Sequence, residues 1–594
     1  MAAAVCAQGA VSTVDVRNVE VPDHKTHFRI PAYKTKQQWL ERKDQLRKQI
    51  LSAAGLLPMP VKTPLHPTFV RRNRFADYSI DVVQLETMPG YFLGGNLYRP
   101  LHTKSAAPAV LLPHGHWKNG RLENQPSYSV PALGINLARQ GYVVFAYDMV
   151  GFNDTRQTPH DFHGWAEDLW GFHPMGLQLW NSIRVLDFLE SLKDVDAKRI
   201  AVTGASGGAT QTFLVAAVDD RVKVSVPVNM VSAYMQGGDP CEEAPGLRPG
   251  TSNVEFAALA APRPMLVVSS THDWTRHTPD EEFPAIRRIY TLLGAPDAVE
   301  NVHLDAEHNY NRESRDAAYG FLAKYLRPEH PSLKDEDVSV PPAADLLAFP
   351  KTDPPANLAN FDAVFERWKA AAVLQMQNVG DAGTLREALR FALGAQWPSQ
   401  VESRVDGTRI VLSRTGVRDR VTGYWSPGRG SPILVIHPDG SSAALQMNVV
   451  EEARRANRPM LLLDPFQSGS TRSQREQYDN YFLSYNRTEA SVRVQDILTA
   501  LWFLKEHCRG TPELLGFGEA GPWSIFAAAV APVSVDVLAD LDGFGGSDQD
   551  FRDRFFVPGI QRVGGLTTAL RLTNRLRAAI PAPRHGADGE LGVQ

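Results

Sequence analysis

The first clear pattern of hydrophobic positions along the chain is that of an amphipathic helix over residues 36–54. Its apolar side chains recur every three or four residues, a spacing that brings them to one face of a helix. These side chains are Trp39, Leu46, Ile50 and Ala53. Gly55 follows, and glycine commonly ends a helix because it adopts left-handed backbone conformations without strain. The pattern predicts a helix that packs by this face and ends at Gly55.

Beyond this helix the hydrophobic period changes to that of strands. Apolar and polar positions alternate across residues 78–98 around a turn at 88–90, which predicts a hairpin. Short apolar runs then alternate with helical segments. These runs are 107–114, 142–148, 199–206, 223–229, 263–270 and 300–304. Apolar strands separated by helices predict an α/β fold with a doubly wound, mostly parallel sheet that helices cover on both faces.

A proline-rich stretch divides the chain. Residues 327–357 contain seven prolines and several charged side chains, a composition typical of a linker. The length of 594 residues also exceeds what one hydrophobic core usually supports. We therefore expect a flexible N-terminus over 1–30, a first domain over 31–326, this linker, and a second domain over 358–594.

The second half repeats the pattern of the first in a weaker form. The run I-L-V-I-H-P-D-G at 433–440 resembles V-L-L-P-H-G at 110–115, and 514–521 resembles 202–209. Two further pairs are 461–464 with 144–148, and the helical stretch up to Gly394 with the helix that ends at Gly55. The same elements in the same order predict an internal duplication whose second copy is degenerate and truncated.

Net charge and cysteine content limit the kinds of partner and site that we expect for this chain. The net charge of −4 gives no basic field for nucleic acid, and no apolar run approaches the roughly 20 residues that span a bilayer. Cys6, Cys241 and Cys508 lie far apart, without the spacing of a metal site or a disulfide framework. The N-terminal M-A-A-A-V-C-A-Q-G-A resembles the end of a secretion signal as much as a flexible terminus. We expect neither nucleic acid nor membrane as a partner; the localisation stays open, with a periplasmic or secreted protein favoured over a cytoplasmic one.

One segment carries the spacing of a catalytic serine. Residues 204–208 read G-A-S-G-G between a predicted strand and a predicted helix, which fits the G-x-S-x-G turn that exposes a nucleophile. Such a turn needs residues with almost no side chain on either side of Ser206. The N–H group of Gly207 would then face the developing oxyanion at a helix N-terminus.

A serine nucleophile needs a base and an orienting carboxylate, and both follow in the expected order. Asp273 comes just after the apolar run at 263–270, and His308 comes just after the run at 300–304. The alternatives are that Asp273 caps a helix and His308 is a surface loop residue. Asp305 and Asp280 are the rival carboxylates, but the first lies too close to His308 in sequence and the second fits a helix start.

The loop P-H-G-H-W at 113–117 should supply the second oxyanion donor, and we assign it to the N–H group of His116. Neighbouring N–H groups are the alternative, as is an ordinary turn in which His114 packs. Aromatic and imidazole side chains further along predict a substrate pocket, with a packed loop as the alternative. The residues assigned to that pocket are Trp117, Trp165, Trp170 and His173. His160 and His163 could bind a metal, but no carboxylate pattern accompanies them, and we expect no metal and no cofactor.

Several segments together resemble the acetylxylan esterase-like group of the α/β-hydrolase superfamily, near the dienelactone hydrolases and prolyl oligopeptidases. They are G-N-L-Y-R-P (95–100), P-H-G-H-W-K-N-G-R (113–121), G-A-S-G-G (204–208), A-P-R-P-M-L-V-V-S (261–269), H-D-W-T (272–275) and H-N-Y-N-R-E-S-R (308–315). The resemblance covers roughly residues 30–330. It implies an α/β-hydrolase fold with Ser206, Asp273 and His308 as the catalytic triad.

We therefore expect a serine carboxylic ester hydrolase that acts through an acyl-enzyme, such as a carbohydrate deacetylase of the acetylxylan type. Its partner would be a small-molecule or carbohydrate ester, and a homo-oligomer stays open. A serine peptidase of the prolyl-oligopeptidase type is the first alternative, although about 100 residues before the core are too few for a propeller. A non-enzymatic binding protein is the second. In the second domain Gly518 replaces the serine, between Phe517 and Glu519, so we expect that domain to lack a triad.

Overall fold

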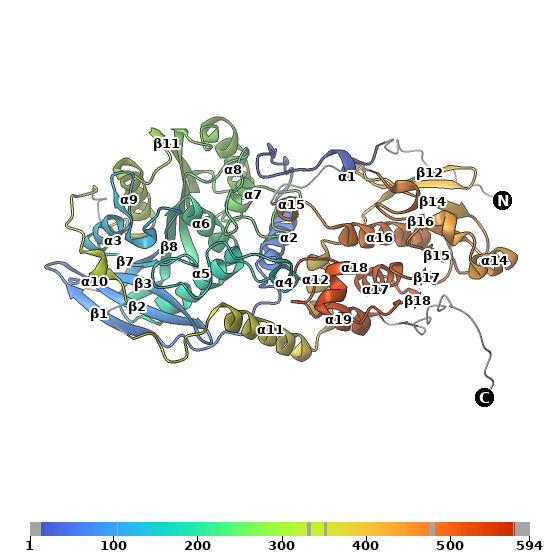
Figure 1. Ribbon diagram of the computed structural model, residues 1–594. Helices are drawn as coiled ribbons and strands as arrows, with labels where there is room; N and C mark the ends of the chain where they lie inside the picture. Colours follow the sequence, from blue (N-terminus) through green and yellow to red (C-terminus); the bar gives the residue numbers. More distant parts are fainter. Residues whose placement is uncertain are drawn as a thin grey trace. The chain divides into compact units, whose positions relative to one another are not determined.

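The computed structural model describes residues 14–103, 105–329, 334–349, 353–473, 481–573 and 575–576. The chain divides into two compact units, each with its own sheet (Figure 1). The larger unit comprises Pro22–Ala372 and Asp479–Tyr485. The smaller unit comprises Met1–Val21, Val373–Tyr478 and Asn486–Gln594. The boundary between the two halves of the chain falls within helix α11 (Phe361–Asn378).

The larger unit is built on a nine-stranded sheet in the order β1-β2-β3-β7-β4-β8-β9-β10-β11. Its strands are β1 (Thr68–Arg74), β2 (Tyr78–Met88), β3 (Tyr91–Pro100), β4 (Ala107–Pro113), β7 (Val143–Tyr147), β8 (Val195–Ala205), β9 (Val222–Val228), β10 (Met265–His272) and β11 (Val299–Glu307). The strands β1, β2, β3 and β7 pair antiparallel, and from β7 to β11 every pairing is parallel. A separate two-stranded sheet holds β5 (Asn124–Gln125) and β6 (Tyr128–Ser129). The predicted α/β fold and all the predicted strands of this unit are confirmed.

Helices cover both faces of this sheet, as Figure 1 shows. Helices α3 (Val130–Arg139) and α9 (Arg312–Leu326) pack on one face, where they enclose an apolar core with side chains of β4, β7, β8, β9 and β10. Helices α5 (Pro174–Ser191) and α6 (Gly207–Val218) pack on the other face. Strands buried from both sides carry near-continuous apolar sequence, which is why their positions could be predicted.

The larger unit contains further helices beside these four. They are α2 (Lys36–Ala53), α4 (Trp165–Leu169), α7 (Asn253–Ala258), α8 (Phe283–Leu292), α10 (Ala343–Leu346) and α15 (Phe482–Tyr485). Helix α2 begins after Thr35, whose side chain accepts a hydrogen bond from the N–H of Gln38, and Gly55 follows it with a φ of +67°. Its buried face contains the four predicted apolar residues, so that prediction is confirmed. None of the described helices is both long and apolar enough to cross a lipid bilayer.

The stretch expected to be a linker packs on the larger unit in its described part. Asp335 forms a buried ion pair with Arg315, at 2.8 Å. The carbonyl of Leu346 accepts hydrogen bonds from the side chains of Asn96 and Arg121. These contacts bury polar groups that must stay paired, and they attach this stretch to the first domain. The compact unit therefore extends beyond the expected boundary at residue 326.

The described part of the N-terminal segment, which begins at residue 14, belongs to the smaller unit. Helix α1 (Val16–Val19) places the guanidinium of Arg17 against two carboxylates. Arg17 lies 2.6 Å from Asp15 and 2.5 Å from the fully buried Asp496. An unpaired buried carboxylate would be costly, so the pair fixes this segment and corrects the expectation of a flexible terminus for its described part.

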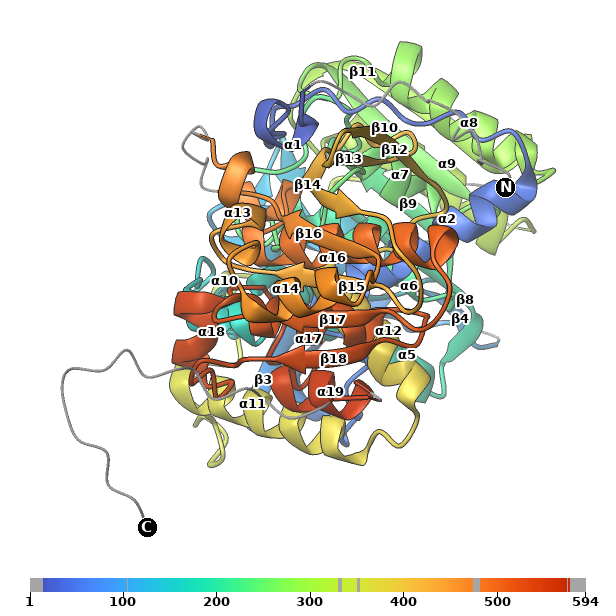
Figure 2. The same ribbon diagram turned by 90° about the vertical axis from the view of Figure 1, so that its right-hand side faces the viewer.

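The smaller unit contains a seven-stranded sheet in the order β12-β13-β14-β16-β15-β17-β18, which Figure 2 shows. Its strands are β12 (Val401–Asp406), β13 (Arg409–Arg414), β14 (Val421–Ser426), β15 (Ile433–Ile436), β16 (Met460–Asp464), β17 (Glu513–Gly516) and β18 (Asp536–Ala539). The first three pairings are antiparallel and the last three are parallel. This order and these directions match the first seven strands of the larger sheet. The described strands include no counterparts of β10 and β11.

The helices of the smaller unit include α12 (Ala382–Leu393), α13 (Ser441–Ala444), α14 (Asn448–Arg455), α16 (Glu489–His507), α17 (Ala520–Val530), α18 (Asp548–Arg554) and α19 (Gly565–Leu572). Helices α16 and α17 pack against the sheet on one side, and α17 also contacts α12 and α19. Helix α12 ends at Gly394 with a φ of +61°, as α2 ends at Gly55. Both helices are thus followed by a glycine with a positive φ.

Candidate active site

Ser206 occupies a sharp turn between strand β8 and helix α6. Its backbone has a φ of 58° and a ψ of −127°, a conformation that a residue with a side chain rarely adopts. Its N–H group donates to the carbonyl of Val228, at 3.1 Å, and anchors the turn to strand β9. The flanking glycines are needed for space. A Cβ atom on either Gly204 or Gly208 would lie 2.4 Å from the carbonyl oxygen of Pro113.

The loop that follows β4 packs directly against this turn. A Cβ atom on Gly207 would lie 2.5 Å from the imidazole ring of His116. Among the described residues no acceptor is assigned to the N–H group of Gly207 or to that of His116. The two predicted oxyanion donors therefore belong to residues that lie close together, and among the described residues neither N–H group has an acceptor.

His114, in the same loop, is a packed residue. It is fully buried, and burial lowers the pKa of its imidazole to about 3. Its Nδ1 lies 2.8 Å from the carbonyl oxygen of Gly115, and its Nε2 accepts a hydrogen bond from the N–H of Met149. Both ring nitrogens are thus used in holding the loop, which leaves this histidine no role as a base.

Asp273 and His308 meet at the carboxyl edge of the sheet, as the sequence predicts. The Oδ1 atom of Asp273 lies 3.3 Å from Nδ1 of His308. The carboxylate is fully buried, and its Oδ2 accepts a hydrogen bond from the hydroxyl of Thr275, at 2.7 Å. The rival Asp305 has an 86% exposed side chain and pairs with His272. A buried, oriented carboxylate beside an imidazole is the arrangement that holds a general base in place.

The imidazole ring of His308 is in contact with two indole rings. Trp117 stacks parallel to it, with centroids 5.5 Å apart and an angle of 7°, and Trp274 lies 4.4 Å away. Within the described part of the chain, Nδ1 of His308 approaches Asp273 without forming a hydrogen bond, and Nε2 has no hydrogen-bond partner. The hydrogen bond from a serine nucleophile to its base is often long before substrate binds, so this nitrogen is free to take a proton.

A buried polar network that sequence reasoning missed connects the loop of His308 to the central strands. The amide of Asn229 donates to the carbonyl of Asn309 and accepts from the hydroxyl of Ser270. Asn309 in turn donates to the same hydroxyl. The hydroxyls of Tyr310 and Thr203 are 2.7 Å apart and join the same loop to β8. A signal existed in the sequence, because each asparagine lies at a strand end or beside His308.

The structure distributes the predicted pocket residues unevenly. Trp117 contacts His308, and Trp165 is 39% exposed on helix α4. Trp170 and His173 are buried, and burial lowers the pKa of His173 to about 4. Nδ1 of His173 also lies 3.5 Å from a carboxylate oxygen of Asp168. Packing therefore accounts for Trp170 and His173, while the other two retain surface that a ligand could touch.

The loop that follows β9 is held by residues that lie far away in the sequence. Arg248 and Glu243 form a fully buried ion pair at 3.2 Å. The hydroxyl of Tyr485 donates to Glu243 at 2.5 Å, and the hydroxyl of Ser484 donates to the carbonyl of the same residue. Burial raises the pKa of the neighbouring Glu242 to about 7. This loop is therefore held in place by buried charges that are paired and hydrogen-bonded.

A second cluster of ionisable side chains lies beside the serine turn. His116, His160, Asp239 and Cys241 bring one nitrogen, oxygen or sulfur atom each to within 4.8 Å of one another. His163, which the sequence grouped with His160, is exposed, and its Nδ1 lies 3.0 Å from the carbonyl oxygen of Asp161. The carboxylate and the thiol that accompany His160 come from a different loop, so the sequence did not reveal the group.

No family model matches the chain. It is 29% identical over 303 residues to "Putative hydrolase YtaP" of Bacillus subtilis, a match that spans 47% of this chain and 98% of that protein. Among solved structures it is 33% identical to Methylesterase BT1017, over 58% of this chain and 78% of that one, with a TM-score of 0.49. A glucuronoyl esterase from Solibacter usitatus is 16% identical, over 51% and 98% of the two chains, with a TM-score of 0.39.

The sequence identity and the architecture lead to the same assignment. The 33% identity extends over more than two thirds of the methylesterase. Independently of any superposition, the mostly parallel sheet carries a serine at a strand–turn–helix elbow, as in the α/β-hydrolase fold. The chain belongs to the α/β-hydrolase superfamily, in the family that includes this methylesterase.

Proposed function

We propose that this protein is a serine hydrolase of carboxylic esters, in which Ser206 is the nucleophile, His308 the general base and Asp273 the orienting acid. The observation that carries the proposal is the backbone of Ser206, with its φ of 58° at the end of β8. A residue with a side chain keeps such a conformation where the surrounding structure holds it, and active sites are where this occurs. The adjacent pair of Asp273 and His308 supplies the base that a serine needs.

In this mechanism Ser206 Oγ attacks the acyl carbon while its proton passes to Nε2 of His308. Asp273 keeps the Nδ1–H of the imidazole directed toward its carboxylate and stabilises the imidazolium that forms. The N–H groups of Gly207 and His116 donate to the tetrahedral oxyanion. His308 then returns the proton to the departing alkoxide, and water activated by the same imidazole releases the acid from Ser206.

The substrate class that we favour is an ester carried by a carbohydrate. Two of the similar structures are named as a methylesterase and a glucuronoyl esterase, and a third as an acetyl xylan esterase. Trp117 stacks on His308 and Trp165 is exposed, so indole surface is present in this unit. Aromatic rings offer a flat apolar face of the kind on which sugar rings pack.

An ester panel with a matched pair of variants tests this function. We expect the wild type to hydrolyse acetylated xylan, methyl esters of uronic acids or short p-nitrophenyl esters faster than an aminoacyl-proline amide. Ser206→Ala should lower turnover by several orders of magnitude, because the nucleophile is lost. Ser191→Ala, at the end of α5, should keep wild-type turnover. Preferred cleavage of the amide would instead favour a peptidase, and an inactive wild type would favour a binding protein.

We further propose that the smaller unit is a catalytically silent copy of the larger one. Its strand order and pairing directions match those of β1 to β9, and Gly518 lies at the position of Ser206. Gly518 keeps a φ of +53°, close to the 58° of the serine, so the turn is preserved without its nucleophile. The strands that carry Asp273 and His308 have no described counterparts.

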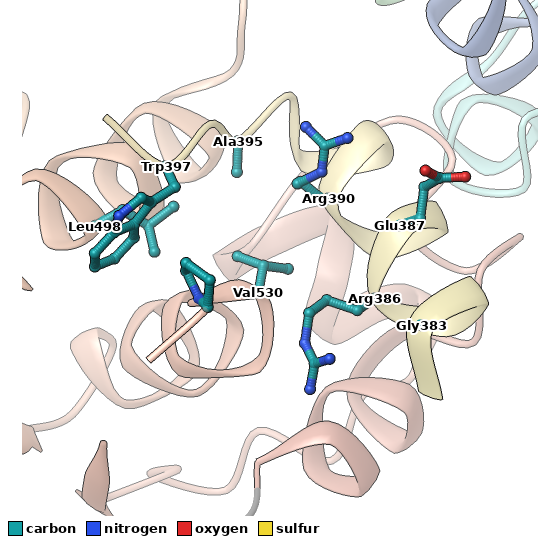
Figure 3. Close-up of a pocket in the computed structure, with 9 residues that line it drawn as sticks. Gly383, Arg386, Glu387, Arg390, Ala395, Trp397, Leu498 and Val530 are labelled. Carbon is teal, nitrogen blue, oxygen red and sulfur yellow. The ribbon is translucent and has the colours of Figure 1, made fainter. Parts of the chain in front are cut away.

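The cavities of the smaller unit support the same proposal. One, of about 270 Å³, is lined by side chains of α12 together with Trp397, Leu498 and Val530. Figure 3 shows that the charged ends of Arg386, Glu387 and Arg390 point in different directions there. Neither this cavity nor a second one of about 380 Å³ has a histidine among its lining residues. These two sites therefore lack the base that serine chemistry needs.

A further inference from the structure

The loops after three parallel strands bring a set of metal-type side chains together. His116 follows β4, His160 follows β7, and Asp239 and Cys241 follow β9. Two imidazoles, a carboxylate and a thiol form the mixed nitrogen, oxygen and sulfur set that zinc prefers over magnesium or calcium. The carboxyl edge of a parallel sheet is also where ligands of α/β proteins gather.

Three distances within the set bracket the separation expected between zinc ligands, and all four atoms lie within 4.8 Å of one another. Nε2 of His116 lies 2.9 Å from Sγ of Cys241 and 3.7 Å from Oδ1 of Asp239. Nε2 of His160 lies 3.1 Å from the same Oδ1 atom. Zinc bonds of about 2.0–2.3 Å at tetrahedral angles separate neighbouring ligand atoms by about 3.4–3.6 Å. Small shifts would therefore seat one ion among all four atoms.

The hydrogen bonding of His160 leaves its Nε2 atom directed at Asp239. Its Nδ1 lies 2.6 Å from the carbonyl oxygen of Val150, so the proton of a neutral ring is on Nδ1. The lone pair of Nε2 then faces the carboxylate oxygen of Asp239, and in the described chain this buried nitrogen has no hydrogen-bond partner. A proton on Nε2 or a metal cation must therefore lie between these two atoms, and the thiol and second imidazole beside them favour the metal. A zinc-bound histidine commonly donates its other N–H to a backbone carbonyl in this way.

We propose that His116 Nε2, His160 Nε2, a carboxylate oxygen of Asp239 and Cys241 Sγ bind one Zn²⁺ in a four-coordinate structural site. As the zinc–sulfur bond forms, the Cys241 thiol releases its proton to solvent, and no group is oxidised or reduced. The thiolate and the carboxylate then balance the charge of the ion. Cys241 is fully buried, whereas Asp239 keeps a 30% exposed side chain that gives the ion a path from solvent.

Such an ion would fix the loop that forms one side of the catalytic turn. The ring of His116 packs on Gly207, and the N–H of the same histidine is our second oxyanion donor. This consequence for catalysis rests on the proposed function, whereas zinc binding does not. We expect zinc removal to lower kcat more than it changes KM, because oxyanion donors act mainly in the transition state.

Metal content of the full-length protein tests the site directly. After equilibration with zinc and dialysis, the wild type should retain about one zinc per chain, and Cys241→Ser and His160→Ala should retain almost none. The matched controls are Cys508→Ser and His163→Ala, which should retain zinc like the wild type. Zinc-free wild type, or equal loss in the controls, would overturn the proposal.

Substitution with Co²⁺ covers the case in which a ligand variant fails to fold. The cobalt-loaded wild type should show the intense visible bands of a tetrahedral site together with a thiolate-to-metal charge-transfer band; their absence contradicts the assignment. Ser206→Ala should keep the zinc and lose ester hydrolysis. Zinc without Ser206-dependent hydrolysis would refute the proposed function alone, and hydrolysis without zinc would refute the metal site alone.

Discussion

At the scale of single residues, the site depends on which carboxylate faces the imidazole. Asp273 is fully buried, receives a hydrogen bond from Thr275 and lies 3.3 Å from His308. Asp305 is close in sequence to that histidine, yet its side chain is exposed and pairs with His272. Burial and orientation, rather than sequence distance, therefore decide which carboxylate can hold a base.

Asp273→Asn should lower kcat by about three to four orders of magnitude, because the amide no longer fixes the tautomer of His308 or stabilises its cation. Asp305→Asn is the matched control. Its kcat should stay near that of the wild type, since an exposed ion pair contributes only about 0–1 kcal/mol to stability. Steady-state kinetics on one ester compares the two variants. A larger loss of turnover in Asp305→Asn would show that the acid has been misassigned.

At the scale of elements, the junction of β8 and α6 requires close backbone contact with β4. A side chain on Gly208 would place its Cβ 2.4 Å from the oxygen of Pro113 and 2.9 Å from the backbone carbon of His114. Both obstacles are main-chain atoms of a neighbouring segment and cannot rotate away. The conformation of the serine turn therefore depends on its close contact with the segment around Pro113, as well as on its own residues.

Gly208→Ala should consequently destabilise the protein by roughly 1–3 kcal/mol, the usual cost of forcing an extra methyl into a packed region. Gly238→Ala provides the comparison, because a Cβ there meets no heavy atom within 4 Å, and its effect should stay within about 0.5 kcal/mol. Denaturant unfolding of both variants measures the difference. Equal stabilities would mean that the close approach at the turn has no energetic importance.

At the scale of the whole molecule, two sheets share one strand order, but one of them stops short. The larger sheet continues through β10 and β11, which end just before Asp273 and His308. The described part of the smaller sheet ends at β18, the counterpart of β9. The described parts of the two units therefore differ by two strands and by the serine that Gly518 replaces.

Restoring the serine alone should not restore catalysis. A Cβ on Gly518 would meet just one neighbouring atom, at 3.7 Å in Pro438, so a serine has space there, at the same backbone strain that Ser206 bears with its φ of 58°. We expect the double variant Ser206→Ala/Gly518→Ser to remain as inactive as Ser206→Ala, because a hydroxyl without a base is a poor nucleophile. Ester hydrolysis that reappears in the double variant would refute a silent second unit.

The sequence predicted what depends on local pattern and order, and missed what depends on contacts between distant loops. Buried parallel strands and the turn at Ser206 leave a pattern in consecutive residues. The grouping of Asn229, Ser270 and Asn309 has no such pattern, since it arises when separate strand ends meet. The ion pair of Asp335 with Arg315 could not be predicted for the same reason, because it joins the proline-rich stretch to a separate segment.

Covalent labelling shows whether Ser206 is the nucleophile. The wild type treated with a serine-directed fluorophosphonate, then digested and analysed by mass spectrometry, should carry one label, on the peptide that contains Ser206. Ser206→Ala should carry none, while Ser191→Ala is labelled like the wild type. A label on another serine, or ester hydrolysis that persists in an unlabelled Ser206→Ala protein, would contradict the account.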